Sequence, residues 1–204
     1  MTKLSILIPV YNQEELVIKC LDSIPRRDDI EVLVRDDGST DSTLKNLRAY
    51  AKQTDLNMKV FANKKNLGVS ATFNRLLESA QGEYFHGVGS DDYLFTEEYS
   101  KLIDSLYETD ADIVCLNLIN NDGNIYMVTH ASERVYCGQG CRFVRKAFAE
   151  GLTYPEDIKV GEDWYFNNEL LARNPKVVYS GRLVYHYNYP REGSLCWQKI
   201  RGLL

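Results

Sequence analysis

Apolar runs alternate with segments of helical spacing along the first half of the chain. Residues 4–10 form a nearly continuous apolar run, as expected for a strand that is buried on both faces. Apolar side chains then recur at helical spacing from Leu16 to Ile24, and Pro25 closes this predicted helix. The alternation continues, predicting strands at 30–34, 58–62, 83–88 and 113–118 and helices at 44–51, 69–80 and 99–106.

This strand–helix rhythm predicts a single α/β domain. Strands joined by helices imply right-handed crossovers and a mainly parallel, Rossmann-like sheet with helices on both faces. Gly82 is expected to cap the helix at 69–80 at its C-terminal end. The 204 residues contain no internal repeat, low-complexity tract or Pro/Ser-rich linker that would mark a domain boundary.

The second half of the chain is patterned less regularly. An Asn-Asp-Gly-Asn turn predicts a hairpin over residues 116–129. Apolar side chains between 143 and 148 predict a helix, and residues 164–172 predict another. Short strands are expected at 177–179 and 183–187.

Charge and composition narrow the classes of function. The chain carries 24 Lys and Arg residues against 29 Asp and Glu residues, which gives a net charge of −5 at pH 7. A nucleic-acid-binding module normally shows a basic field, so nucleic acid is not expected as a partner. No window approaches the roughly 18 apolar residues of a membrane span, and the N-terminus lacks the long apolar core of a signal peptide.

The cysteines predict a reducing compartment. Five are scattered along the chain without the paired spacing of a zinc site, and without export signals they are expected to stay reduced. The predicted location is therefore cytoplasmic. The five are Cys20, Cys115, Cys137, Cys141 and Cys196.

Polar residues follow each of the first four predicted strands. Ligands of open α/β sheets bind beyond the carboxyl ends of the strands, where such residues meet at one edge. Each group has an ordinary structural interpretation by itself, such as Asn12 with Glu15 as a helix cap or residues 91–92 as a solvated turn. Together they predict a site for a polyanion and a metal ion. The groups are Pro9, Tyr11 and Asn12, then residues 36–41, 63–68 and 89–92.

The loop after the first strand excludes two common phosphate sites. A Rossmann dehydrogenase needs a glycine-rich turn there, but Pro9 is followed by Val-Tyr-Asn-Gln-Glu, and the chain has no Walker lysine motif. A nucleotidyltransferase that makes activated sugars would want a glycine-rich, basic phosphate loop at the same place, which is also absent. The adjacent carboxylates of Asp91 and Asp92 suit a hard cation such as Mg²⁺ or Mn²⁺.

Five segments resemble those of family 2 glycosyltransferases and occur in the same order. They include Asp-Asp-Gly-Ser at 36–39 and Gly-Glu-Asp-Trp at 161–164. The resemblance extends from residue 4 to about residue 195 and implies a GT-A fold. It also implies metal-dependent, inverting hexosyl transfer from a nucleotide sugar, usually UDP-linked, to a hydroxyl acceptor. The five segments are residues 5–12, 34–42, 66–69, 82–92 and 161–164.

The resemblance implies roles for residues on the donor side. Pro9 and Tyr11 match the first nucleotide-contact segment, in which the Tyr ring lies against the base. Asp37 matches the acid that hydrogen-bonds the uracil edge. Asn66 and Gly68 match the loop that lines the nucleotide pocket.

The same resemblance assigns the reacting centre. Asp91 and Asp92 match the acidic element at the diphosphate, with Asp91 on the nucleotide sugar and Asp92 as the ligand of Mn²⁺ or Mg²⁺. The ion would stabilise the departing diphosphate. Asp163 matches the general base that takes the proton of the acceptor hydroxyl.

Two positions depart from the family pattern. Gly89 stands where the commonest spelling has Asp, and Phe73 stands where Arg is frequent. Arg75, Lys64 and Lys65 are alternative sources of positive charge for the phosphates, and the sequence does not choose among them. A non-catalytic sugar-nucleotide-binding or scaffold relative is therefore the second interpretation of function.

Four further side chains lie in or near these segments. Glu162 either orients Asp163 or is a helix-start charge that faces water. Trp164 is either a platform for an acceptor sugar or a core anchor of its helix. His186 lies where the family places a loop that closes over the diphosphate, and His86 is expected to be a core histidine with its hydrogen bonds made.

The resemblance also implies the partners. Residues 1–118 would bind the nucleotide-sugar donor and residues 119–204 a saccharide or lipid-linked saccharide acceptor, in cell-envelope or extracellular polysaccharide synthesis. Residues 196–204 mix apolar and basic side chains, as in a membrane-surface helix or a last helix of the domain. Peripheral association with the inner face of the membrane would suit a lipid-linked acceptor.

Overall fold

One curved sheet forms the centre of the computed structural model, which describes residues 2–128, 138–158, 160–194, 198 and 201–202. Within these residues the strand order is β3-β2-β1-β4-β8-β6-β9-β5, and β7 pairs with β6 off this path. The strands are β1 (Leu4–Val10), β2 (Ile30–Asp36), β3 (Met58–Ala62), β4 (Tyr84–Gly87), β5 (Tyr93–Leu94), β6 (Ile113–Asn120), β7 (Ile125–Tyr126), β8 (Arg142–Arg145) and β9 (Val177–Tyr187).

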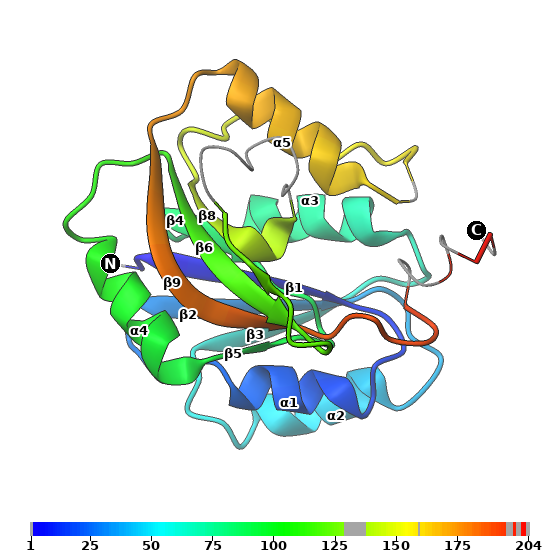
Figure 1. The fold of residues 1–204 in the computed structure, drawn as a ribbon. Coiled ribbons are helices and arrows are strands. Elements are labelled where there is room, and N and C mark those ends of the chain that lie inside the picture. Colours follow the sequence, from blue (N-terminus) through cyan, green and yellow to red (C-terminus); the bar gives the residue numbers. More distant parts are fainter. Residues whose placement is uncertain (1, 129–137, 159, 195–197, 199–200, 203–204) are drawn as a thin grey trace.

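Helices cover both faces of the sheet, as Figure 1 shows. α1 and α2 pack side by side on one face, α3 packs on β1 and β2 from the other, and α4 packs against β9. The helices are α1 (Leu16–Asp22), α2 (Thr43–Ala51), α3 (Val69–Ser79), α4 (Thr96–Ser105), α5 (Glu162–Ala172) and the 3₁₀ turn η2 (Gln139–Cys141).

The first half of the chain builds the parallel part of the sheet. β1 pairs in parallel with β2 and with β4, and β2 pairs in parallel with β3. Six of the seven residues in each of β1 and β2 are buried, because helices cover both faces. The carboxyl ends of these strands therefore meet at one edge, on the right in Figure 1. The predicted α/β sheet with helices on both faces is confirmed.

Residues 143–148 do not form the predicted helix. Arg142–Arg145 form β8, which pairs antiparallel with β4 and with β6 in the middle of the sheet. Phe143 and Val144 are 0 % and 1 % exposed, because neighbouring residues of a strand point to opposite faces and both faces are covered. A strand buried on both faces shows no alternation, so its short apolar run can be mistaken for a helical segment.

Residues 177–187 form one strand, β9, where the sequence predicted two. Gly181 lies inside it at a φ of +67°, and the register against β6 shifts between Cys115 and Leu118. These irregularities bend the long strand without ending it. The predicted hairpin is confirmed, since β6 and β7 pair antiparallel across the turn that contains Gly123.

Gly82 does not cap α3. The cap position is Ala80, in an extended conformation with ψ of 136°. The Gly82 N–H donates to Ser5 Oγ at 2.8 Å, and a Cβ at position 82 would lie 2.6 Å from the Ser5 nitrogen. Glycine is therefore required here because the backbone passes directly against β1.

His86 is a buried histidine of β4 with both ring nitrogens in hydrogen bonds, as predicted. Nδ1 lies 2.8 Å from the Tyr99 hydroxyl and Nε2 lies 3.2 Å from the Gly140 carbonyl. Burial lowers the pKa of the His86 imidazole to about 3. The neutral ring therefore ties α4 and η2 to the centre of the sheet.

His86 is expected to make the fold less stable in mild acid. The unfolded chain takes up a proton at His86 below a pKa of about 6.5, whereas the folded chain resists protonation down to about 3. The stability that His86 contributes is present above about pH 6.5 and is lost as the pH falls toward 3, at up to about 1.4 kcal/mol per pH unit. Denaturant unfolding between pH 7 and pH 4.5 should show this slope, and His86→Gln should flatten it. Equal slopes in the two proteins would contradict the assignment.

Candidate functional site

The loops after β1 and β2 are braced against each other at the sheet edge. Asn12 has a φ of +50°, its Oδ1 accepts the Thr40 N–H at 2.9 Å, and its own N–H donates to Ser39 Oγ at 2.9 Å. Glu15, the N-cap residue of α1, makes no side-chain capping hydrogen bond. The interpretation of Asn12 and Glu15 as a capping pair is therefore wrong, since Asn12 joins the two loops instead.

Asp37 is 4 % exposed and lies at the centre of the loops after β2 and β3. Its Oδ1 accepts Asn63 Nδ2 at 2.8 Å and the Leu67 N–H at 2.9 Å, and its Oδ2 accepts the Gly68 N–H at 2.9 Å. A carboxylate offers about four acceptor positions, so one on Oδ2 is left for a ligand. Asp37 fixes the 66–68 loop, and its contact with uracil stays a prediction.

Gly38 allows the loops after β2 and β3 to touch. It has a φ of +73°, and a Cβ there would lie 2.5 Å from the Lys65 carbonyl carbon. A side chain at this position would push the two backbones apart. The close packing of the two loops therefore explains why the Asp-Asp-Gly-Ser motif has glycine at this position.

The other donor-side residues lie at the surface of this edge. Tyr11 is 43 % exposed, and Pro9 is half-buried at the end of β1. Asn66 is exposed, and its Oδ1 accepts the Gly68 N–H at 3.1 Å. Arg75 Nη1 donates to the Asn63 Oδ1 at 2.8 Å, which places its charge beside the Asp37 network.

Phe73, which departs from the family pattern, belongs to the core. It is 5 % exposed and its ring lies 5.3 Å from that of Tyr154. The positive charge that Arg would bring there is replaced by an aromatic contact between α3 and the segment before α5.

Asp92 is a buried carboxylate, so the acidic pair after β4 is not a solvated turn. It is 5 % exposed, the Tyr185 hydroxyl donates to its Oδ2, and the Asn188 N–H donates to its Oδ1 at 2.8 Å. Burial and the adjacent charge of Asp91 raise the pKa of the Asp92 carboxyl above its ordinary value. A bound cation would favour its ionised form.

Asp91 is paired with a residue of the segment that follows β9. Arg191 Nε and Nη2 both donate to Asp91 Oδ2, at 2.9 Å and 2.7 Å. The side chains of Asp91 and Arg191 are 22 % and 24 % exposed. The segment after β9 therefore lies over the acidic pair and partly shields it from solvent.

Gly89, which also departs from the family pattern, packs closely against Asp92. Its N–H donates to the Tyr185 hydroxyl at 3.0 Å, and its carbonyl accepts the Cys20 Sγ at 3.5 Å. A Cβ at position 89 would lie 2.4 Å from Asp92 Oδ2. Glycine at this position is thus a condition for the observed orientation of Asp92.

The donor set of the acidic pair fits a hard divalent cation. Mg²⁺ and Mn²⁺ prefer carboxylate oxygens and are often held by one or two carboxylates together with substrate phosphates and water. Within the described ranges, no three His, Cys, Asp or Glu side chains gather into a closed metal cage. Asp91 and Asp92 are therefore suited to an ion that is shared with a bound diphosphate.

Asp163 lies in the first turn of α5. Its Oδ1 accepts the Trp164 N–H at 2.9 Å, and a Cβ at Gly138 would lie 3.8 Å from its Oδ2. Gly138 leads into η2, where a Cβ at Gly140 would lie 2.8 Å from the ring of Tyr185. η2 therefore lies between Asp163 and the tyrosine that contacts Asp92, while the other predicted site residues follow the carboxyl ends of the parallel strands β1–β4.

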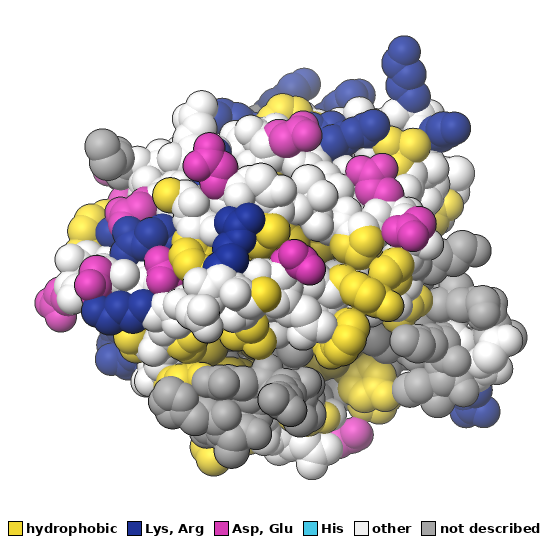
Figure 2. Space-filling model, turned by 90° about the horizontal axis from the view of Figure 1, so that it is seen from above, with side chains coloured by type: hydrophobic (Ala, Val, Ile, Leu, Met, Phe, Trp, Pro, Cys, Tyr) yellow, Lys and Arg dark blue, Asp and Glu magenta, His cyan; other side chains and the backbone are white. Residues whose placement is uncertain are grey.

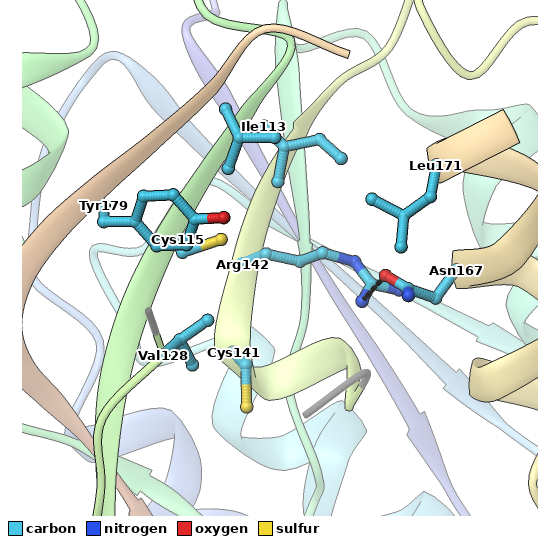
Figure 3. Close-up of a pocket in the computed structure, with 9 residues that line it drawn as sticks. Ile113, Cys115, Val128, Cys141, Arg142, Asn167, Leu171 and Tyr179 are labelled. Atoms are coloured by element: carbon cyan, nitrogen blue, oxygen red, sulfur yellow. Dashed lines mark hydrogen bonds between the residues drawn. The ribbon is translucent and has the colours of Figure 1, made fainter. Parts of the chain in front are cut away.

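A buried ion–amide contact fixes α5 to the sheet. Figure 3 shows Arg142 reaching from β8 toward Asn167 of α5, and its Nη1 donates to the Asn167 Oδ1 at 2.6 Å. The two side chains border a small cavity of about 20 Å³. Asn167 lies one helical turn after Asp163, so this contact also restrains the start of α5.

The structure excludes one of the two interpretations of Trp164 and shows the surroundings of His186. Trp164 is 48 % exposed and packs edge-on against the half-exposed Tyr165, so it is not a core anchor. His186 stacks on Tyr93 with ring centroids 4.2 Å apart, and its buried Nδ1 has no hydrogen-bond partner in the described chain. Residues Cys137, Cys196, and most of the tail at 196–204 lie outside the described residues.

On the face shown in Figure 2, acidic and basic side chains are interspersed. A larger open hollow of about 610 Å³ lies at the opposite edge of the sheet, where Gly82 and Glu83 precede β4 and Arg145 ends β8. None of the helices formed by described residues is long and apolar enough to span a membrane.

Sequence reasoning missed the residues that support the acidic pair. Tyr185 and Asn188 contact Asp92 from more than 90 positions away, and Arg191 pairs with Asp91. Arg191 stands near the segment that the family places over the diphosphate, so a weak signal existed for it. Nothing in the spacing of Tyr185 distinguishes it from the neighbouring aromatic residues of β9.

The chain matches known proteins in sequence. The family model described as glycosyl transferase family 2 matches residues 5–172. A poly(ribitol-phosphate) beta-glucosyltransferase of Bacillus spizizenii is 30 % identical over 94 % of this chain and 33 % of its own length. Glycosyltransferase GlyA of Streptococcus pneumoniae is 28 % identical over 95 % of this chain and 31 % of its own length. The chain thus spans about a third of the length of these curated relatives.

Solved structures share the fold. S. aureus TarS 1–349 in complex with UDP-GlcNAc has a TM-score of 0.82 and 26 % identity, covering 95 % of this chain and 60 % of that one. The mannosyltransferase PcManGT of Pyrobaculum calidifontis, in complex with GDP-Man and Mn²⁺, has a TM-score of 0.78 and 20 % identity, covering 98 % of this chain and 60 % of that one. The predicted GT-A fold is confirmed.

Asp37→Asn is expected to destabilise the protein by about 1–3 kcal/mol, because the amide nitrogen that replaces one carboxylate oxygen cannot accept the hydrogen bond which that oxygen now accepts. Denaturant unfolding of the variant measures the loss. Asp122→Asn, which alters an exposed acid of the β6–β7 turn, serves as the control. A variant with the stability of the unmodified protein would show that these hydrogen bonds do not hold the loop.

Proposed function

Because the chain belongs to glycosyl transferase family 2, we propose that it transfers a sugar from a UDP-linked donor to a hydroxyl acceptor, with inversion at the anomeric carbon. The observation that carries this proposal is the convergence of three groups at one edge of the sheet. These are the loops around Asp37, the acidic pair after β4, and Asp163 at the start of α5. The likeness to TarS, solved with UDP-GlcNAc, supports a UDP-sugar as the donor.

The nucleotide is proposed to bind across the ends of β1, β2 and β3. Tyr11 offers an exposed ring for stacking on the base, with Pro9 beneath it at the strand end. Asp37 offers its remaining acceptor position to the uracil imide N–H. Asn66 and Gly68 form the wall of this pocket, held in place by their contacts with Asp37 and with each other.

The diphosphate is proposed to lie beside Asp91 and Asp92. Asp92 would hold Mn²⁺ or Mg²⁺, and Asp91 would contact the nucleotide sugar. When bound, the ion neutralises the charge that develops on the diphosphate as it leaves. Arg191, which contacts Asp91, would bring a second positive charge to the same place.

Asp163 is proposed to act as the general base on the acceptor. Its carboxylate takes the proton from the acceptor hydroxyl while that oxygen forms a bond to the anomeric carbon. The bond between the anomeric carbon and the diphosphate oxygen breaks, and its electron pair leaves with the UDP. Attack from the side opposite the leaving group inverts the anomeric configuration.

The acceptor is proposed to be a saccharide or lipid-linked saccharide of a cell-envelope or extracellular polysaccharide. The glucosyltransferase of B. spizizenii, whose name specifies poly(ribitol-phosphate), supports a cell-wall polymer as the broader class. Residues 119–204 would form the acceptor side and residues 1–118 the donor side. We place the protein in the cytoplasm, at the inner face of the membrane where lipid-linked acceptors are found.

Asp92→Ala should abolish the metal-dependent tightening of UDP binding, because it removes the carboxylate that holds the ion. Calorimetric titration of UDP with and without Mn²⁺ measures the effect. Asp122→Ala, which alters an exposed acid in the β6–β7 turn, should leave the tightening intact. Undiminished Mn²⁺ enhancement in Asp92→Ala would remove Asp92 from the metal site.

Asp163→Asn should lower turnover by about 10²–10⁴-fold, because the amide keeps the shape of the side chain but cannot take a proton. UDP and Mn²⁺ affinities should stay unchanged, since Asp163 is proposed to touch the acceptor. Transfer rate and UDP affinity are measured on the same preparation, with Glu169→Gln, which alters an exposed acid further along α5, as the control. Near-normal turnover in Asp163→Asn would contradict the base assignment, and no turnover in the unmodified protein with any donor would favour a non-catalytic binding protein.

A further inference from the structure

We infer that Tyr185 is a positioning residue, which holds the Asp92 carboxylate in the orientation that binds the metal ion. This inference rests on the proposed function, because it assigns to Tyr185 a part in that site. Tyr185 belongs to β9, and the family resemblance gave it no role.

The hydrogen bonds of the Tyr185 hydroxyl fix the direction of its proton. The Gly89 N–H donates to the hydroxyl oxygen at 3.0 Å. The same hydroxyl lies in hydrogen-bond contact with Asp92 Oδ2. A backbone N–H can only donate, so the oxygen accepts from Gly89 and its single hydrogen is directed to Asp92.

The ring of Tyr185 cannot easily move the hydroxyl elsewhere. Tyr185 is 2 % exposed, and its ring lies edge-on to His86 with centroids 5.9 Å apart. The ring also packs closely against Gly140, where an added Cβ would lie only 2.8 Å from the ring carbon that bears the hydroxyl. Since rigid packing sets the place of the hydroxyl, the carboxylate must orient to meet it.

The absence of a side chain at position 89 makes this contact possible. A Cβ on Gly89 would lie 2.4 Å from Asp92 Oδ2, the oxygen that accepts the tyrosine hydrogen. The chain therefore has glycine at the position where the Asp92 carboxylate lies against the backbone. Gly89 and Tyr185 therefore act as one unit around a single carboxylate oxygen.

The consequence concerns the affinity of the site for the ion. With Tyr185 on Oδ2 and the Asn188 N–H on Oδ1, the carboxylate plane is fixed from two sides before an ion arrives. Hydrogen bonds to a ligating carboxylate orient it, and their removal typically weakens metal binding by about 10–100-fold.

The test is a calorimetric titration of the full chain with Mn²⁺ in the presence of UDP. Tyr185→Phe keeps the ring and removes only the hydroxyl, and it should weaken Mn²⁺ binding by about 10–100-fold while UDP binding without metal is unchanged. Tyr84→Phe is the matched control. It removes another buried tyrosine hydroxyl, which donates to the Ala111 carbonyl near the other end of β4, and it should leave Mn²⁺ binding unchanged.

Gly89→Ala provides an independent route to the same contact if Tyr185→Phe folds poorly. The added Cβ should displace Asp92 Oδ2, so the affinity for Mn²⁺ should fall. Because both changes disrupt the same contact, the double variant of Tyr185→Phe and Gly89→Ala should lose no more Mn²⁺ affinity than the more affected single variant. Mn²⁺ affinity equal to that of the unmodified protein in Tyr185→Phe, or an equal loss of UDP binding without metal, overturns the inference. Absence of Mn²⁺-dependent UDP binding in the unmodified protein overturns the proposed metal site itself, and with it the inference.

Discussion

A carboxylate that is taken out of water must be given hydrogen-bond donors, and three of the four buried carboxylates in the described chain join separate segments of the fold. Glu31, Asp37 and Asp92 are each 5 % exposed or less. Glu31 accepts Ser5 Oγ at 2.7 Å, which ties β2 to β1 at one edge of the sheet. Asp37 and Asp92 do the same at the other edge, where the donors come from the loop after β3 and from β9. The charges proposed to bind the donor substrate are thus also the groups that hold the loops together.

The first half of the fold could be predicted because its signals are local. β1 and β3 begin and end within the predicted ranges, and α3 starts at Val69 as its apolar spacing indicates. Parallel strands that are buried on both faces appear in the sequence as unbroken apolar runs, and amphipathic helices separate them. The same regularity places the residues that follow each strand at one edge, so Tyr11, Asp37 and the acidic pair could be grouped without a structure.

The second half could not be predicted because its determinants are not local. β8 is held between β4 and β6, which are about 60 and 30 positions earlier in the chain, and its four residues carry no period. The bend at Gly181 divides β9 into two apparent strands in the sequence, although one ladder runs along β6. The support of Asp92 by Tyr185 depends on a side chain chosen by packing, and no spacing in the sequence marks it.

The separation between Asp92 and its donors has a consequence for synthesis on the ribosome. Asp91 and Asp92 leave the ribosome about 90 residues before Tyr185 and Asn188, so two adjacent carboxylates first meet water with none of their final partners. They acquire those partners only when β9 has paired with β6, a contact between segments some 65 residues apart. A nascent chain can therefore form the parallel sheet and the loops around Asp37 while its acidic pair still lacks the hydrogen bonds from Tyr185 and Asn188. Under the proposed function, binding of a metal-bound diphosphate would report that the last strand is in place, because the donors to Asp92 come from β9 and the residues after it.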